Sequence, residues 1–178
     1  SESDRVISDS FDLCASILPR LHFDYDILPE QTLSSAAARD GRIVVGDEEY
    51  QVFIGSPLAV SGPARRVIQE FVSSGGAVIL PPISRERPDL DAVVRELAPI
   101  LGSRGQGSFD GEPPYVTLYR GELGSTVTAV LAGTTDREAL AEALDGALRE
   151  CISPDVEIYA GDGAPLPDVR YVHRISGD

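Results

Sequence analysis

The stretch FVSSGGAVILPP, Phe71 to Pro82, decides the fold class. It holds the end of an amphipathic segment, a Gly75-Gly76 turn and the wholly apolar strand Ala77–Leu80, which Pro81-Pro82 closes. A short, wholly apolar strand is typical of a parallel sheet that is covered on both faces. Such sheets usually carry their chemistry just past the carboxyl ends of the strands, on backbone N–H groups and short polar loops. Proline has no N–H, so Pro81-Pro82 is a poor start for a catalytic loop.

On either side of this stretch, predicted helices alternate with short strands. Apolar residues spaced three and four apart predict the helices, and apolar runs bounded by Gly, Pro or Asp predict the strands. The elements expected before Gly75 are a helix over about Asp4–Leu21, a half-exposed strand at Phe23–Leu28, a helix from Pro29 to about Ala38, a turn at Asp40-Gly41, a hairpin around Gly46-Asp47, a strand at Val52–Gly55 and a helix capped by Ser61. Those expected after Leu80 are a helix over about Pro88–Leu101, a loop over Gly102–Pro114, strands at Tyr115–Arg120 and Thr126–Leu131, a helix with a Thr135–Glu138 capping box, and β structure in VEIYA (156–160) and VRYVHRIS (169–176).

This order of elements predicts a single α/β domain over residues 1–178. We expect it to be doubly wound, with a mostly parallel sheet and helices on both faces. The hairpin and the two strands after residue 114 are expected to add antiparallel edges. Because the chain contains no Met, we expect it to be a processed product or a piece cut from a larger multidomain protein.

Composition excludes several classes of function. The net charge is −14, with 29 acidic against 15 basic residues, and every basic residue is Arg. An acidic surface disfavours nucleic acid and anionic lipid as partners. The absence of Lys removes Schiff-base chemistry and P-loop phosphate binding. No apolar run approaches the roughly 20 residues that a membrane span needs, and residues 1–10 lack the pattern of a signal peptide.

The candidate nucleophiles and bases do not form a recognisable site. Ser56 in FIGSPLAV follows a strand, but Pro57 removes the N–H that would donate to an oxyanion, which favours a loop serine. His22 lies just past the first helix, where it can satisfy terminal carbonyls, and His173 lies in the last strand pattern. Neither histidine is spaced to pair with a nucleophile.

The cysteines, the paired carboxylates and the Gly-rich stretches do not identify a functional site either. Cys14 and Cys151 lie at helical core positions, where we expect small buried hydrophobes rather than a metal site or a disulfide scaffold.

Asp24 and Asp26 in FDYD would stand roughly 7 Å apart on one strand face, within the range of glycosidase pairs. The chain has no Trp to stack on a sugar, so a polar strand face is favoured. SSGGAV leads from helix into strand, the wrong order for a phosphate loop. We therefore expect no cofactor and no metal.

The run from Phe23 to Pro82 resembles a segment of large bacterial glycoside hydrolases of the α-L-rhamnosidase type. The similarity covers residues 5–82 and, in the tail VRYVHRISGD, residues 165–178. The positions in register are Tyr25, Asp40-Gly41-Arg42, Tyr50, Pro57, Gly75 and Gly76.

In those enzymes the segment is similar to a class I glutamine amidotransferase-like, flavodoxin-like domain beside a catalytic barrel, and related β-galactosidases use such a domain for oligomer assembly. Active glutaminases carry a Gly-x-Cys-x-Gly elbow and a later His-x-Glu. Here no Cys is flanked by Gly, and Arg174-Ile175 follows His173. The resemblance therefore implies the fold without that activity: a non-catalytic accessory domain that packs against a catalytic barrel or β-sandwich of the same polypeptide, or that forms a homo-oligomer, outside the cytoplasm.

Two other functions stay open at the level of sequence. One is a free-standing small α/β hydrolase or small-ligand-binding domain that uses Ser56 with Asp24 and Asp26. The other is a pure oligomerisation module.

Overall fold

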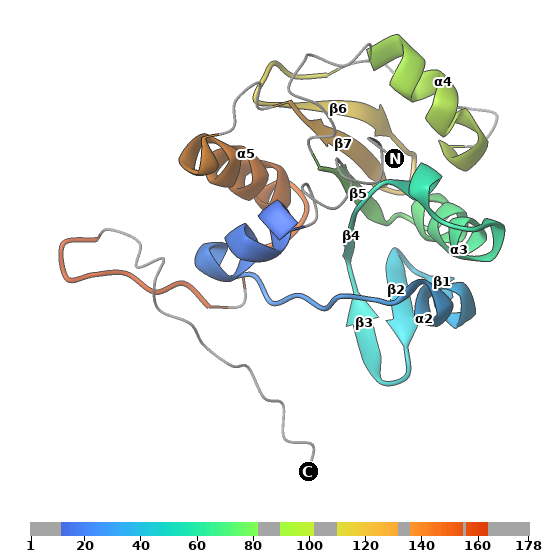
Figure 1. The fold of residues 1–178 in the computed structure, drawn as a ribbon, viewed down its shortest axis with the longest axis horizontal. Helices are drawn as coiled ribbons and strands as arrows, with labels where there is room; N and C mark the ends of the chain where they lie inside the picture. Colours follow the sequence, from blue (N-terminus) through green and yellow to red (C-terminus); the bar gives the residue numbers. More distant parts are fainter. Residues whose placement is uncertain (1–11, 82–89, 102–109, 132–135, 155, 164–178) are drawn as a thin grey trace.

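The computed structural model describes residues 12–81, 90–101, 110–131, 136–154 and 156–163 (Figure 1). This part of the chain is α/β, with a three-stranded antiparallel sheet and a four-stranded, mostly parallel sheet. Residues 12–17 are helical; the other helical elements are η1 (Leu18–Leu21), α2 (Glu30–Ser35), η2 (Pro57–Ala59), α3 (Gly62–Ser73), α4 (Leu90–Leu101) and α5 (Arg137–Arg149). The strands are β1 (Ala37–Arg39), β2 (Arg42–Val45), β3 (Glu48–Tyr50), β4 (Val52–Ile54), β5 (Ala77–Leu80), β6 (Tyr115–Arg120) and β7 (Thr126–Val130).

The larger sheet has the strand order β4-β5-β7-β6. β4, β5 and β7 are parallel, and β6 adds one antiparallel edge. The strand predicted at Ala77–Leu80 is confirmed, and all four of its residues are buried. The prediction that both late strands form antiparallel edges is wrong for β7, because its parallel pairing with β5 makes it an inner strand.

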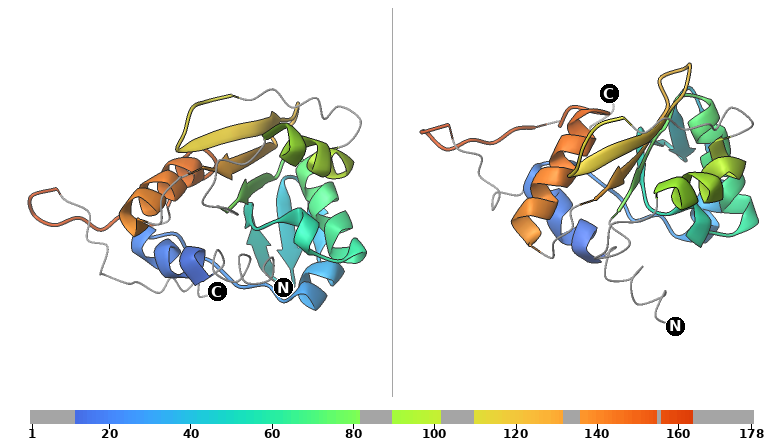
Figure 2. Two further views of the ribbon diagram at one scale, coloured as in Figure 1. Left: turned by 45° about the horizontal axis from the view of Figure 1, so that its top comes forward. Right: turned by 90° about the horizontal axis from the view of Figure 1, so that it is seen from above.

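Helices cover both faces of this sheet. On one face, α3 and α4 pack against a cluster that includes Val78, Leu80 and Leu118. On the other, residues 14–18 and α5 pack around Ile79 and Val130. Figures 1 and 2 show the blue N-terminal helix beside α5 in every view, away from α3 and α4. Alternate side chains of the apolar β5 thus enter opposite cores, which is why that strand needs no polar face.

The Gly75-Gly76 turn is a point of close packing. Gly75 follows the α3 C-cap at φ +110°, and a Cβ there would lie 2.8 Å from the carbonyl oxygen of Leu123. A Cβ on Gly76 would lie 2.2 Å from the ring of Phe71. The N–H of Gly41 donates to Ser74 Oγ at 3.1 Å. The turn before β5 therefore contacts both the β1–β2 turn and the β6–β7 turn, and it fixes the two sheets relative to each other.

The strand predicted at Phe23–Leu28 is wrong, because this segment pairs with no strand and runs irregularly from η1 to α2. Two side chains hold it instead. Tyr25 donates its hydroxyl to the carbonyl of Ala15 at 3.1 Å, and Asp26 accepts from the hydroxyl of Tyr50 at 2.7 Å. The apolar–acidic alternation correctly reports that Phe23 is buried while Asp26 is exposed. Side chains can, however, be alternately buried and exposed in a segment that pairs with no other strand.

The helix predicted from Pro29 to about Ala38 exists but ends at Ser35. Residues 37–39 form β1, which pairs antiparallel with β2. The Asp40-Gly41 turn, with φ of 51° and 70°, folds β1 back onto β2, so cross-strand pairing overrides the helix propensity of the alanines. The hairpin predicted around Gly46-Asp47 is confirmed and joins β2 to β3.

Three predictions at element ends differ from the structure. Ser61 is the N-cap residue of α3, but its side chain makes no capping bond; its N–H donates to Glu30 Oε1 at 2.9 Å. Asp136, not Thr135, caps α5, because its carboxylate accepts the N–H of Glu138 at 3.1 Å. No strand forms over residues 156–160, where Tyr159 alone carries bridge pairing. Residues 82–89, 102–109 and 132–135, and the predicted strand VRYVHRIS, lie outside the described residues.

Substituting Gly76→Ala should destabilise the domain by about 1–3 kcal/mol, because the new methyl group overlaps the ring of the buried Phe71. Gly62→Ala is the matched control: it lies in the first turn of α3 with nothing within 4 Å of its Cβ position. We expect Gly62→Ala to change the free energy of unfolding by less than about 1 kcal/mol. Urea denaturation of both variants measures the difference, and equal midpoints would contradict this account of the turn.

Candidate functional site

Ser56 lies where the sequence predicts it, directly past the carboxyl end of β4. The N–H of Gly55 donates to the carbonyl oxygen of Ile79 at 3.0 Å, so hydrogen bonding between the β4 and β5 chains continues up to the residue before Ser56. The carbonyl of Ser56 then accepts the N–H of Ala59 at 3.0 Å, so the chain turns at once into η2. Pro57, the next residue, is almost completely buried. The position resembles that of a nucleophile in an α/β hydrolase, but the adjacent backbone donor is missing.

The loop that follows Ser56 is held by a guanidinium and a carboxylate. Arg65 donates from Nε to Pro57 O at 3.3 Å and from Nη2 to Val60 O at 3.2 Å. Glu30 accepts hydrogen bonds from the side chain and backbone of Ser61, and these bonds lower the pKa of its carboxyl group. Both charged groups are thus engaged with the backbone of the loop, which makes the loop part of the framework.

Asp24 and Asp26 each hydrogen-bond a different tyrosine. Asp24 Oδ1 accepts the N–H of Tyr25 at 3.0 Å, and Asp26 Oδ2 accepts the hydroxyl of Tyr50 at 2.7 Å. Tyr50 lies before the amino end of β4 and Ser56 lies after its carboxyl end. The whole of β4, Val52–Ile54, lies between these two residues. The structure therefore places Ser56 and Asp26 at opposite ends of β4 and does not bring them together.

Tyr50 is the most perturbed phenol of the described residues. Burial raises its pKa to about 12, helped by the hydrogen bond to Asp26 and by the negative charges of Asp26, Glu48 and Asp24. A phenol held protonated in this way is a hydrogen-bond donor rather than a base or nucleophile. Its contact with Asp26 anchors the segment from η1 to α2 onto the three-stranded sheet.

Of the two histidines, only His22 lies in the described part of the chain; His173 lies outside it. His22 is buried and adopts the left-handed conformation, with φ of 61°, at the C-cap of η1, just past the first helix as predicted. Hydrogen bonds from Arg149 and Tyr159 lower the pKa of Glu157, with the smallest contribution from His22. The η1 turn that His22 ends packs with α5, on the opposite side of the sheet from the core that α3 forms.

Both cysteines are free thiols in packed surroundings. Cys14 is buried beside α5, and burial raises the pKa of its thiol to about 11. Cys151 is half-buried; its Sγ donates to the carbonyl of Ala147 at 3.4 Å, and burial raises its pKa as well. The prediction of a small buried hydrophobe is confirmed for Cys14 and holds in part for Cys151.

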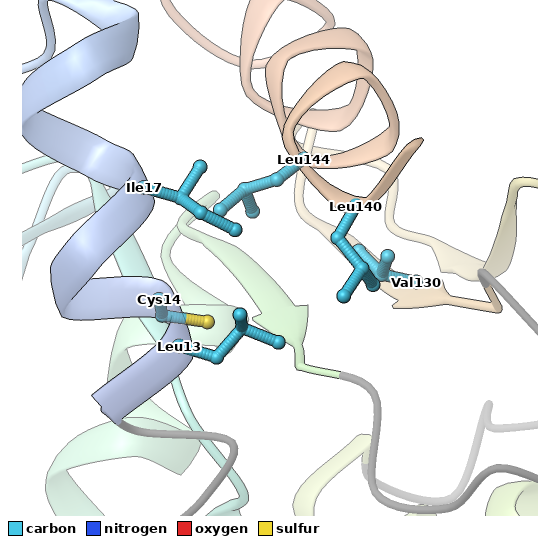
Figure 3. Close-up of a pocket in the computed structure, with 6 residues that line it drawn as sticks. All are labelled: Leu13, Cys14, Ile17, Val130, Leu140 and Leu144. Carbon is cyan, nitrogen blue, oxygen red and sulfur yellow. The ribbon is translucent and has the colours of Figure 1, made fainter. Parts of the chain in front are cut away.

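A small cavity lies between residues 13–17 and α5, shown in Figure 3. Its lining is apolar apart from the Cys14 sulfur: Leu13, Cys14, Ile17, Val130, Leu140 and Leu144. The cavity measures about 10 Å³, whereas one water needs about 10–15 Å³ and small-molecule pockets measure about 300–1,000 Å³. It is a packing void in the core and not a ligand site.

A charged cluster at the end of α5 was not foreseen from the sequence. Arg149 Nε lies 2.9 Å from both carboxylate oxygens of Asp145, and Nη1 lies 2.6 Å from Glu157 Oε1. The hydroxyl of Tyr159 also hydrogen-bonds Glu157. The four-residue spacing of Asp145 and Arg149 is a sequence signal for their pairing. Glu157 lies beyond the helix, so only the fold brings it to Arg149.

Within the described ranges, no three His, Cys, Asp or Glu side chains are grouped so that they could hold a metal ion. Nor is any described helix long and apolar enough to cross a membrane. Comparisons with protein-family models, with curated proteins and with solved structures found no match.

Asp26→Asn should lower the pKa of Tyr50, because the substitution removes the hydrogen bond and the nearest negative charge. Asp24→Asn, the matched control, removes the weakest contributor and should move the pKa less. Since the folded-state pKa lies above the ordinary value of 10, the stability that Tyr50 contributes is present below that pH and is lost as pH rises toward about 12. Phenolate absorbance measured against pH tests both points; equal shifts in the two variants would contradict the assignment.

Thiol alkylation of the native protein should modify Cys151 before Cys14, because Cys14 is more deeply buried and its pKa is raised to about 11. Mass spectrometry after brief treatment with iodoacetamide measures the order. In denaturant the two rates should converge, and a faster native reaction at Cys14 would show that this thiol is accessible.

Proposed function

We propose that the chain is a non-catalytic accessory domain of a glycoside hydrolase of the α-L-rhamnosidase type. Its fold would then be the class I glutamine amidotransferase-like, flavodoxin-like arrangement. Its role would be to pack against the catalytic barrel or a β-sandwich of the same polypeptide, or to mediate assembly. The acid and base of the glycosidase would lie on another part of that polypeptide.

One observation carries this proposal: the residues that make the resemblance hold the framework together. Tyr25 and Tyr50 anchor the segment between η1 and α2 through Ala15 and Asp26. Gly75 and Gly76 form the close-packed turn before β5. A set of residues that serves packing is what an accessory domain would share with its relatives.

Arg42 and Pro57, two other positions of the resemblance, also hold the framework together. Arg42 forms an ion pair with Glu49 across β2 and β3 at 3.1 Å. Pro57 is buried, and its carbonyl accepts a hydrogen bond from Arg65. The clamped loop past β4 supports a role in which the carboxyl edge of the sheet does no chemistry.

The exposed apolar side chains suit contact with a neighbouring domain through loops. The large exposed hydrophobic residues of the described chain are Ile27, Leu123, Val156 and Tyr159, and all four lie outside helices and strands. The apolar faces of α3 and α5 are already used by the sheet. An interface would therefore use the loops and the three-stranded sheet.

The purified chain should not hydrolyse aryl rhamnosides or aryl galactosides, whereas an active glycosidase assayed in parallel should. Turnover by the chain that survives repurification would overturn the proposal. Ser56→Ala should leave folding unchanged and remove no activity. If the variant stays folded but loses a measurable hydrolase or ligand-binding signal, the hydrolase that uses Ser56 with Asp24 and Asp26 becomes the better account.

Sedimentation of the chain over a wide concentration range separates the packing role from pure oligomerisation. An accessory domain that packs within its own polypeptide should remain monomeric. A stable oligomer at low concentration favours assembly as the role, and a monomer at high concentration contradicts the pure oligomerisation module.

A further inference from the structure

The segment that follows α5 is attached to the domain by charge more than by apolar burial. None of the residues 156–163 falls in the buried class, and Val156 and Tyr159 are exposed. No helix or strand forms over these residues. They stand in contrast to α5 itself, whose inner face is fully buried. A segment with little buried apolar surface has a low local free energy of opening.

In the described part of the chain, Glu157 is the main side-chain contact between this segment and α5, and Tyr159 in addition carries bridge pairing. Arg149, in the last turn of α5, contacts Glu157 Oε1 at 2.6 Å. Tyr159, within the segment, hydrogen-bonds the same carboxylate. Glu157 therefore ties the segment to the last turn of α5, eight residues earlier in the chain.

We propose that residues 156–163 form a strap, which the Arg149–Glu157 ion pair latches to the end of α5 and which opens while the rest of the domain stays folded. Both partners are partly exposed, with side-chain exposures of 43% and 38%. Ion pairs between exposed groups are weak and are screened by salt. The latch is therefore sensitive to ionic strength and to any anionic group that competes for Arg149.

The neighbouring ion pair supplies an internal control. Arg149 also contacts Asp145, four residues earlier on the same helix face. Arg149→Gln breaks the latch, while Asp145→Asn breaks only the pair within α5. Neither substitution alters the sequence around Tyr159, so a protease that cleaves after Tyr159 meets the same site in both variants.

Limited chymotrypsin digestion, followed by mass spectrometry, tests the strap. We expect Arg149→Gln to raise the rate of cleavage after Tyr159 about two- to fivefold, the upper part of the range of population changes for loss of an exposed ion pair. Asp145→Asn should change it by less than about twofold. Raising NaCl should speed cleavage of the unsubstituted protein and affect Arg149→Gln less, with each rate normalised to that of a small peptide substrate.

The midpoint of thermal unfolding, followed by circular dichroism, distinguishes local from global opening. This midpoint should be almost the same in Arg149→Gln and in Asp145→Asn. Equal cleavage rates in Arg149→Gln and the unsubstituted protein would overturn the latch. Faster cleavage accompanied by a matching loss of global stability would overturn the strap, because the segment would then open only with the whole domain.

Discussion

The arrangement of this protein depends on a steric constraint at Gly75-Gly76, where three turns meet without room for a side chain. The ring of Phe71 lies against Gly76, the carbonyl of Leu123 lies over Gly75, and the N–H of Gly41 reaches Ser74. This contact ends α3, aims β5 into the centre of the larger sheet and ties the three-stranded sheet to it. A methyl group at either glycine would disturb the packing of both sheets at once.

The opposite end of the sheet explains why prolines are tolerated past the strands. Pro57 is buried, and its carbonyl is held by Arg65, while Glu30 holds Ser61 at the start of α3. Pro81 directly follows β5. A loop whose backbone is held by side chains of the neighbouring helices needs rigidity, which proline provides, more than free donors. Such an edge is compatible with a domain whose surface serves packing.

The sequence-based expectations failed where a local signal had two possible causes. The alternation that begins at Phe23 reflects alternate burial of residues 23–26 in an irregular segment that Tyr25 and Asp26 anchor, and not pairing with a strand. The alanines before Asp40 favour a helix, yet they pair with β2 because the following turn brings that strand alongside. Ser61 looked like a capping side chain, but its hydrogen bonds go to Glu30 from another helix. In each case a partner outside the segment itself decided the outcome.

The sequence by itself determined the α/β class, the buried strand at Ala77–Leu80 and the turn at Gly75, because the periodicity of apolar residues and the conformational range of glycine are local properties. Only the tertiary structure decided that β7 pairs in parallel with β5, that Ser56 and Asp26 lie at opposite ends of β4, and that Glu157 reaches Arg149. These features depend on which segments meet in space. That meeting is set by how the helices pack on the two faces of the sheet, and no short stretch of sequence encodes it.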